Sequence, residues 1–86
     1  MRPLKQLLEI LKEGVKDRQL NNEFFFLCTT VERIYGFKKI TWDEKTHLLT
    51  YLKQNKPSYV VTSKPWFEPN DFKSRINWLN EQINKL

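Results

Sequence analysis

Apolar side chains recur near the start of the chain at the spacing of an amphipathic helix. Pro3 suits the first turn of a helix, because its missing N–H would be unpaired there anyway. Five apolar residues follow on a single stripe of a helix that we expect to run to about Arg18: Leu4, Leu7, Leu8, Leu11 and Val15. Gly14 lies inside this helix and weakens it by about 1 kcal/mol relative to alanine. It either permits the close approach of a neighbour or is a tolerated cost.

A second helix is predicted from Glu23 to about Tyr35. Asn21 or Asn22 can cap its start, and Gly36 suits the left-handed backbone conformation that is common at the end of a helix. The residues predicted on its core face are Phe24, Leu27, Cys28, Val31, Ile34 and Tyr35.

Three consecutive phenylalanines extend the apolar surface of the second helix beyond one stripe. Phe24, Phe25 and Phe26 point in different directions on a helix, so they cannot all face one small core. We therefore predict that this run contributes to a contact between subunits of a homo-oligomer.

The third helix carries the clearest local signal. Thr41 and Glu44 are spaced as a capping box, in which each side chain accepts a hydrogen bond from the other residue's backbone N–H. The helix should run from Trp42 to about Gln54, and Pro57 should end it. Its shared face is predicted to hold Lys45, with its aliphatic stem, and Leu48, Leu49 and Leu52.

Residues 56–70 hold three of the four prolines and show no helical period. Asp71 can cap a last helix with a heptad-like seam made of Phe72, Ile76, Leu79, Ile83 and Leu86. The pattern therefore predicts an all-α fold. It is a single four-helix domain over residues 1–86, with an irregular aromatic and basic segment before the last helix.

The composition narrows the class of protein. The chain has 86 residues, of which 40% are apolar and 29% charged, as in ordinary folded domains. No apolar run is long enough to span a membrane, and we expect a cytoplasmic protein. A core this small leaves only a few kcal/mol of net stability, which also favours a homo-oligomer.

Residues suited to catalysis or metal binding are scarce. His47 is the only histidine and Cys28 the only cysteine, and they lie far apart in the sequence, so a metal site within one chain is not expected. The two glycines are isolated, so no phosphate-binding glycine loop is present. We predict no catalytic residues, no cofactor and no enzymatic activity.

The charge and the aromatic residues suggest binding. The net charge is +5, and most of the excess lies after residue 37. Aromatic side chains that stack on bases are interleaved there with cations that pair with phosphate, among them Lys38, Lys39 and Trp42. The leading hypothesis is a non-enzymatic protein that sequesters a nucleotide-like anion, with these ligand-binding residues: Lys56, Tyr59, Lys64, Trp66, Lys73 and Arg75.

Several other interpretations remain open. The exposed aromatics can instead bind a host protein, as an inhibitor or adaptor, since Trp, Tyr and Arg also dominate protein-binding hot spots. Non-specific binding of nucleic acid is a third hypothesis. The aromatics can also simply close a small core, the basic residues can form a solvated face, and Arg75 can pair with Asp71 in a structural role.

Residues 24–86 resemble a diffuse set of small helical proteins encoded by large tailed bacteriophages. The resemblance rests on these elements: Leu27-Cys28, Ile40-Thr41 with Glu44, Leu52 and Pro57, Trp66-Phe67, and Arg75-Ile76-Asn77-Trp78-Leu79. The chain departs from the pattern at Phe26, where a small residue is common, and at Ser74, where proline is common. The resemblance implies a phage origin and a helical fold, but no established activity. Small non-enzymatic phage proteins often act against host defences, so on this resemblance we expect a counter-defence role in the host cytoplasm, against a nucleotide signal or a host protein.

Overall fold

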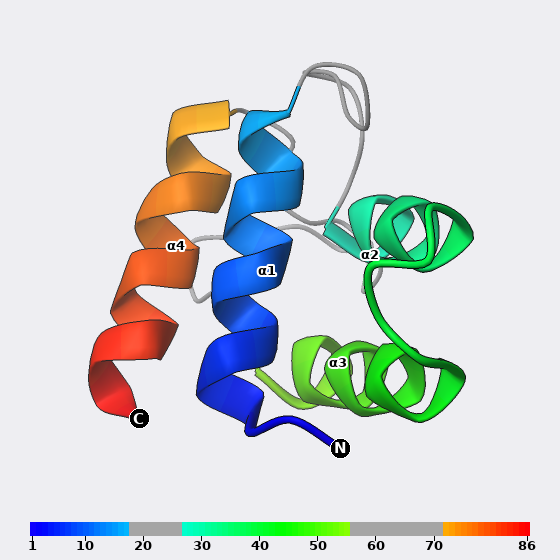
Figure 1. Cartoon of the computed structure of the whole chain (residues 1–86). Coiled ribbons are helices and arrows are strands. Elements are labelled where there is room, and N and C mark those ends of the chain that lie inside the picture. The colour runs from blue at the N-terminus through cyan, green and yellow to red at the C-terminus, as the bar shows by residue number, and fades with distance from the viewer. Residues whose placement is uncertain (18–26, 56–71) are drawn as a thin grey trace.

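Four helices make up most of the chain that the computed structural model describes, namely residues 1–17, 27–55 and 72–86. They are α1 (Leu4–Lys16), α2 (Leu27–Gly36), α3 (Trp42–Gln54) and α4 (Phe72–Lys85), and the described ranges contain no strand (Figure 1). The all-α fold predicted from the hydrophobic pattern is confirmed. The third helix has its predicted bounds, and α1 ends two residues earlier than expected.

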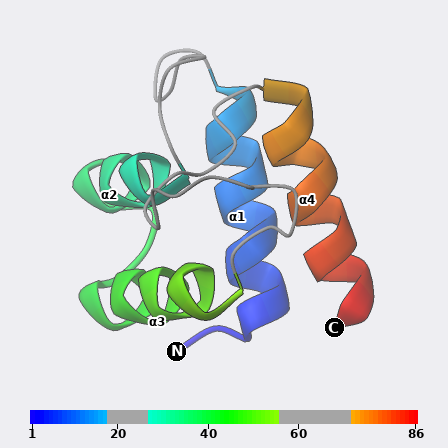
Figure 2. The same ribbon diagram turned by 180° about the vertical axis from the view of Figure 1, so that it is seen from behind.

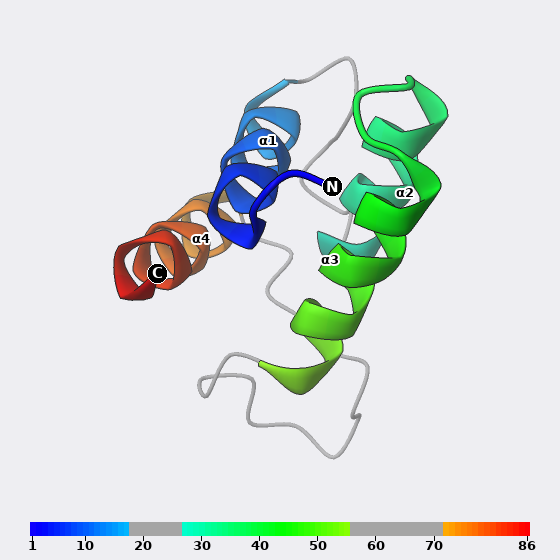
Figure 3. The ribbon, with the colours of Figure 1, turned by 60° about the horizontal axis from the view of Figure 1, so that its bottom comes forward.

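The helices form two antiparallel pairs. α1 and α4 lie side by side and run in opposite directions, and α2 and α3 form a hairpin on the other side of α1 (Figures 1 and 2). α1 packs against all three other helices and is the central element of the fold. The view from below shows that the α2–α3 pair lies across α1 rather than along it (Figure 3).

The core is built from the predicted apolar stripes. Its buried residues are Leu7, Leu8, Leu11 and Val15 of α1, Leu27, Val31 and Ile34 of α2, Ile40 of the following turn, Leu48 and Leu52 of α3, and Trp78, Leu79 and Ile83 of α4. Leu4, Cys28, Tyr35 and Leu49 are partly buried against this cluster, as their positions on the predicted faces require.

Gly14 marks the closest approach of α1 to α2. A Cβ atom added at this position would lie 2.7 Å from Cγ2 of Ile34 and 3.4 Å from Cγ2 of Thr30. Ordinary carbon contacts are about 3.5–4.0 Å. The glycine is therefore required by packing, which settles the choice that the sequence left open.

The end of α2 differs from the prediction. Gly36 is the last helical residue and does not have a positive φ, and the left-handed residue is Lys38, with φ 61°. The N–H of Lys38 donates to the carbonyl of Tyr35 at 2.9 Å, and the N–H of Lys39 donates to the carbonyl of Ile34 at 3.0 Å. This is the Schellman pattern, and it places a lysine where glycine is the usual residue.

The buried face of α4 also differs from the predicted seam. Leu79 and Ile83 are buried as expected, but Ile76 is only half-buried and Leu86 is 52% exposed. The buried face instead includes Arg75, Trp78 and Gln82. The helix is therefore rotated toward two polar residues that a search for apolar spacing does not select.

Tyr51 links α3 to α4. Its hydroxyl donates a hydrogen bond to Oε1 of Gln82 at 2.6 Å, and its ring lies 6.5 Å from the ring of Trp78. Burial raises the pKa of the Tyr51 hydroxyl above its usual value, because the phenolate form loses solvation there. A polar pair thus supports the packing of these two helices.

Several predictions fall outside the described residues. These are the phenylalanine run at positions 24–26, the irregular segment at 56–70, the helix end at Pro57 and the cap at Asp71. None of the described helices has the length and apolar character needed to cross a membrane.

Candidate functional site

The turn between α2 and α3 presents two large apolar side chains to solvent. We call residues 37–42 the α2–α3 corner. Phe37 is 57% exposed and Trp42 is 60% exposed, whereas Ile40 between them is buried in the core. The corner is therefore anchored from inside by one apolar residue and displays two aromatic residues on its outer side.

Two lysines lie between the exposed aromatics. Lys38 and Lys39 are both exposed, and within the described residues their ammonium groups make no ion pair. The left-handed backbone at Lys38 and the two hydrogen bonds of the Schellman motif hold this stretch in one conformation. The corner thus combines apolar surface with two lysines that have no ion-pair partner among the described residues.

The start of α3 is held by the predicted capping box. The N–H of Glu44 donates to the Thr41 hydroxyl oxygen at 3.2 Å, and the N–H of Thr41 donates to Oε1 of Glu44 at 2.8 Å. These contacts satisfy two backbone N–H groups that would otherwise lack partners at the helix terminus. They also fix the backbone from which the Trp42 side chain projects.

Arg2 completes this arrangement from the N-terminal segment. Its guanidinium donates two hydrogen bonds to the Glu44 carboxylate, from Nε to Oε2 at 2.8 Å and from Nη2 to Oε1 at 2.8 Å. Its backbone N–H also donates to Oε2 of Glu44 at 3.1 Å, and Nη2 donates to the carbonyl oxygen of Lys39 at 2.9 Å. One arginine therefore ties the N-terminal segment to both the turn and α3.

Glu44 is buried and ionised. The hydrogen bonds from the Arg2 side chain, followed by the one from the Thr41 backbone, hold the pKa of its carboxyl well below the usual range despite burial. The same carboxylate raises the pKa of Arg2. A buried carboxylate with this many donors is a structural anchor, so we assign Glu44 to support of the corner and not to proton transfer.

Lys45 joins α3 to α2 beside the corner. Its Nζ lies 3.4 Å from Oε2 of Glu32 and 4.5 Å from the centre of the Tyr35 ring. The stem of Lys45 was predicted to share the apolar face, and its side chain is only 18% exposed. This cation–π contact adds a further link between the two helices of the hairpin.

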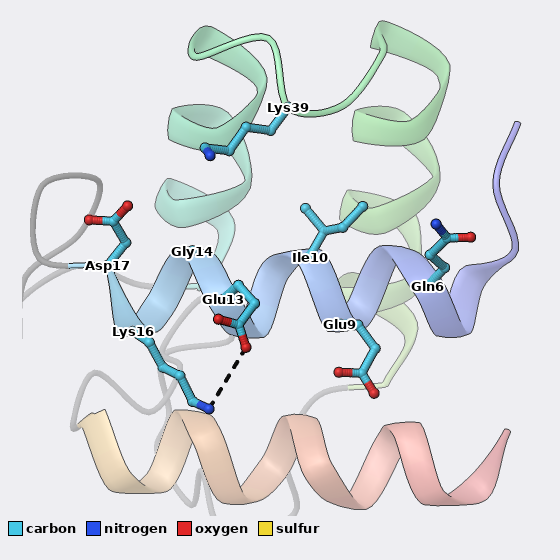
Figure 4. Close-up of a pocket in the computed structure, with 8 residues that line it drawn as sticks. All are labelled: Gln6, Glu9, Ile10, Glu13, Gly14, Lys16, Asp17 and Lys39. Atoms are coloured by element: carbon cyan, nitrogen blue, oxygen red, sulfur yellow. Dashed lines mark ion pairs between the residues drawn. The ribbon is translucent and has the colours of Figure 1, made fainter.

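A groove of about 510 Å³ runs along α1 next to the corner (Figure 4). Lys39 reaches over it from the corner, and the other lining residues belong to α1 and its end: Gln6, Glu9, Ile10, Glu13, Gly14, Lys16 and Asp17. Three carboxylates in this lining are spaced four residues apart in the sequence, two of them on α1 and the third just after its end. We call Glu9, Glu13 and Asp17 the acidic row.

The two glutamates of the acidic row are only weakly neutralised within α1. Lys12 Nζ lies 4.0 Å from Oε2 of Glu9, and Lys16 Nζ lies 3.8 Å from Oε1 of Glu13. The two glutamates are 48% and 72% exposed, and such surface pairs contribute about 0–1 kcal/mol. These lysines can therefore leave their partners at little cost when another positive group approaches.

Most of the residues predicted to bind an anion cannot be compared with the prediction, because they are not among the described residues. Lys56, Tyr59, Lys64 and Trp66 lie outside the described residues. Lys73 is exposed, whereas Arg75 is fully buried on the core side of α4 and interacts with other parts of the protein. Arg75 therefore has the position expected for the structural alternative, and the nucleotide hypothesis stays a prediction.

Cys28 and His47 provide no sign of a metal site. Both are half-buried, and the described ranges contain no group of three histidine, cysteine or acidic residues placed to hold a metal ion.

Searches of protein-family models, curated proteins and solved structures found no match to this chain. The resemblance to phage proteins consequently stays a prediction.

Sequence reasoning noted Trp42, Lys38 and Lys39 but did not select the corner. It missed Phe37 because that residue follows the expected end of a helix, where both buried and exposed side chains are common. A usable signal was nevertheless present, since two aromatics flank two lysines between a helix end and a capping box.

Proposed function

We propose that this chain is a non-enzymatic binding protein that contacts another protein through the α2–α3 corner. The observation that carries the proposal is the exposure of Phe37 and Trp42 on a backbone held by the capping box, the Schellman motif and Arg2. Trp is among the side chains that dominate protein-binding hot spots, and Phe is enriched in protein interfaces.

The exposed area is large enough to matter for affinity. An aromatic side chain buries about 150–250 Å² in an interface, so side chains that are about 60% exposed leave about 100–150 Å² each to be covered. At about 25 cal/mol per Å², covering Phe37 and Trp42 would contribute about 5–7 kcal/mol before the cost of association.

The rigidity of the corner supports the same role. Ordering a loop and its side chains on binding costs free energy, and this cost is lower where the backbone is already fixed. Here Glu44 accepts hydrogen bonds from both Arg2 and Thr41, and Arg2 also holds the carbonyl oxygen of Lys39. The corner is therefore prepared for a contact without refolding.

The charges favour a protein over a polyanion as the partner. Lys38 and Lys39 favour an acidic group beside the aromatics, but Lys39 shares its groove with the acidic row. A nucleic acid lying there would bring phosphates toward three carboxylates, which is unfavourable. A folded protein surface can present opposite charges to both regions, as complementary interfaces commonly do.

The resemblance to phage proteins suggests where such a partner would be found. An inhibitor or adaptor acting on a host protein would be one form of such a contact. The nucleotide-sequestering alternative depends on Lys56, Tyr59, Lys64 and Trp66, and the described residues provide no separate observation in its favour.

Affinity capture tests the proposal directly. The tagged wild-type chain should retain a protein partner in a fixed ratio, and Phe37→Ser or Trp42→Ser should release it. Leu86→Ser is the matched control, because Leu86 is 52% exposed but lies at the end of α4. Equal retention by Trp42→Ser and by the wild type, with both folded by circular dichroism, would reject the corner as the contact site.

A further inference from the structure

We infer that the partner of the α2–α3 corner is a second copy of this chain, which receives the corner of its neighbour on its own acidic row. This inference rests on the proposed function, because it takes the corner as a protein-contact site. It adds the identity of the partner and the geometry of the complex.

The first argument is that opposite charges line the same groove. Lys39 lines the groove from the corner, while Glu9, Glu13 and Asp17 line it from α1 (Figure 4). The glutamates of the row are well exposed, and the lysine beside them has no ion-pair partner among the described residues. The surface therefore has a positive half and a negative half.

A surface of this kind is complementary to itself under two-fold rotation. In a two-fold dimer the same patch faces its own copy, so the positive half of each chain meets the negative half of the other. Lys38 and Lys39 of one protomer would then approach Glu9 and Glu13 of its partner, and the reverse contact would form at the same time. Each favourable contact is thus made twice.

The apolar groups fit the same arrangement. Ile10 is half-buried and lines the groove, where it offers apolar surface to an incoming side chain. Phe37 and Trp42 flank the two lysines, so they would be carried onto the groove together with them. The exposed aromatic side chains of both protomers would therefore be buried together when the dimer forms.

The overall charge gives a reason why local complementarity is needed. Each chain carries +5, so two copies repel one another at long range. The net charge therefore opposes a dimer, and a contact that places lysines against carboxylates offsets this repulsion locally. The inference is therefore open to a test by exchange of charges.

The experiment uses sedimentation velocity on the wild type and two doubly substituted chains, Lys38→Glu/Lys39→Glu and Glu9→Lys/Glu13→Lys. We expect the wild type to reach twice the chain mass of 10.5 kDa as its concentration rises. Each variant alone should stay monomeric, because like charges then face each other across the two-fold axis. An equal mixture of the two should again form dimers, because both lysine–glutamate contacts are restored, one in its original direction and the other with the charges exchanged.

A matched control excludes attraction between any two oppositely altered chains. Lys53→Glu/Lys85→Glu changes two exposed lysines outside the groove lining, so this chain should self-associate like the wild type, and adding Glu9→Lys/Glu13→Lys to it should not raise the amount of dimer. Circular dichroism on each variant verifies that it is folded. Three outcomes would overturn the inference: a wild type that stays monomeric, a dimer that persists in both Lys38→Glu/Lys39→Glu and Glu9→Lys/Glu13→Lys, or an equal mixture of these two variants that forms no dimers.

The outcome also separates this inference from the proposed function. If the wild type is monomeric but captures a different protein through Trp42, the second-copy inference fails and the contact role of the corner stands. If Phe37→Ser and Trp42→Ser change neither self-association nor capture, the proposed function fails as well.

Discussion

Replacing Gly14 by alanine tests the packing of α1 against α2. The substitution changes one hydrogen atom into a methyl group at a point where two helices already touch. Two effects oppose each other: alanine favours the helix by about 1 kcal/mol, and the new Cβ would meet Ile34.

The size of the clash follows from the geometry. The new Cβ would lie 2.7 Å from Cγ2 of Ile34, which is about 1 Å inside ordinary carbon contact. Ile34 cannot turn aside easily, because it is fully buried and branched at Cβ. Overpacking of this kind costs about 1–3 kcal/mol, so with a clash near 2 kcal/mol we expect a net loss of about 1 kcal/mol.

Urea unfolding followed by circular dichroism measures this loss as a change in the free energy of unfolding. For a domain of this size, a loss of about 1 kcal/mol lowers the thermal midpoint by about 4–8 °C. A Gly14→Ala variant that is as stable as the wild type, or more stable, would show that the contact with Ile34 does not limit the packing.

A second substitution isolates the contact itself. Ile34→Leu removes the Cγ2 branch while retaining the side-chain volume. In that background Gly14→Ala should stabilise the protein by about 1 kcal/mol, which is the helix-propensity gain alone. The coupling between the two sites should thus be about 2 kcal/mol, and additive effects would contradict the explanation.

Three further predictions concern the corner and the α3–α4 contact. Lys38→Gly should raise the free energy of unfolding, measured in urea, by about 1 kcal/mol, because glycine adopts the left-handed conformation without strain. A loss of stability would show that the lysine side chain has a folding role. Glu44→Gln should destabilise the protein above about pH 5. Because the pKa of Glu44 is depressed in the folded state, the stability advantage of the wild type should shrink as the pH falls below about 4.3. A stability difference in urea titrations that does not depend on pH would refute the anchoring role. Tyr51→Phe should cost about 1–2 kcal/mol, because it removes the hydrogen bond to the buried Gln82, and thermal unfolding unchanged from the wild type would contradict this.

Local signals predicted most of the helical architecture. The stripe of Leu7, Leu8, Leu11 and Val15 is buried, and the Thr41–Glu44 capping box forms at the expected helix start. Both features depend on residues within a few positions of each other, so they can be recognised from spacing alone.

The errors occur where tertiary contacts decide the outcome. α2 continues through Gly36, and the chain reverses at Lys38, from where it places Ile40 in the core. The buried face of α4 includes Gln82 because Tyr51, 31 residues away, donates to its side chain. Neither the position of Ile40 nor the partner of Gln82 is visible from local spacing.

The candidate site was predicted only in part for the same reason. Trp42, Lys38 and Lys39 were noted as aromatic and basic residues, but their position on one corner depends on the turn geometry. The contact between Arg2 and Glu44 spans 42 residues, and no local pattern marks it. The sequence indicated the relevant residue types, and the fold determines which of them meet.

Hydroxyl-radical footprinting read by mass spectrometry tests the central claim, that the α2–α3 corner is a protein-contact site. Oxidation of Phe37 and Trp42 would be compared between the dilute, monomeric chain and the same chain in complex, either with itself at high concentration or with a captured partner. We predict that both residues become protected together, while Leu86, which is exposed at the far end of α4, keeps its reactivity. A complex in which Phe37 and Trp42 are oxidised as fast as in the free chain would contradict the claim.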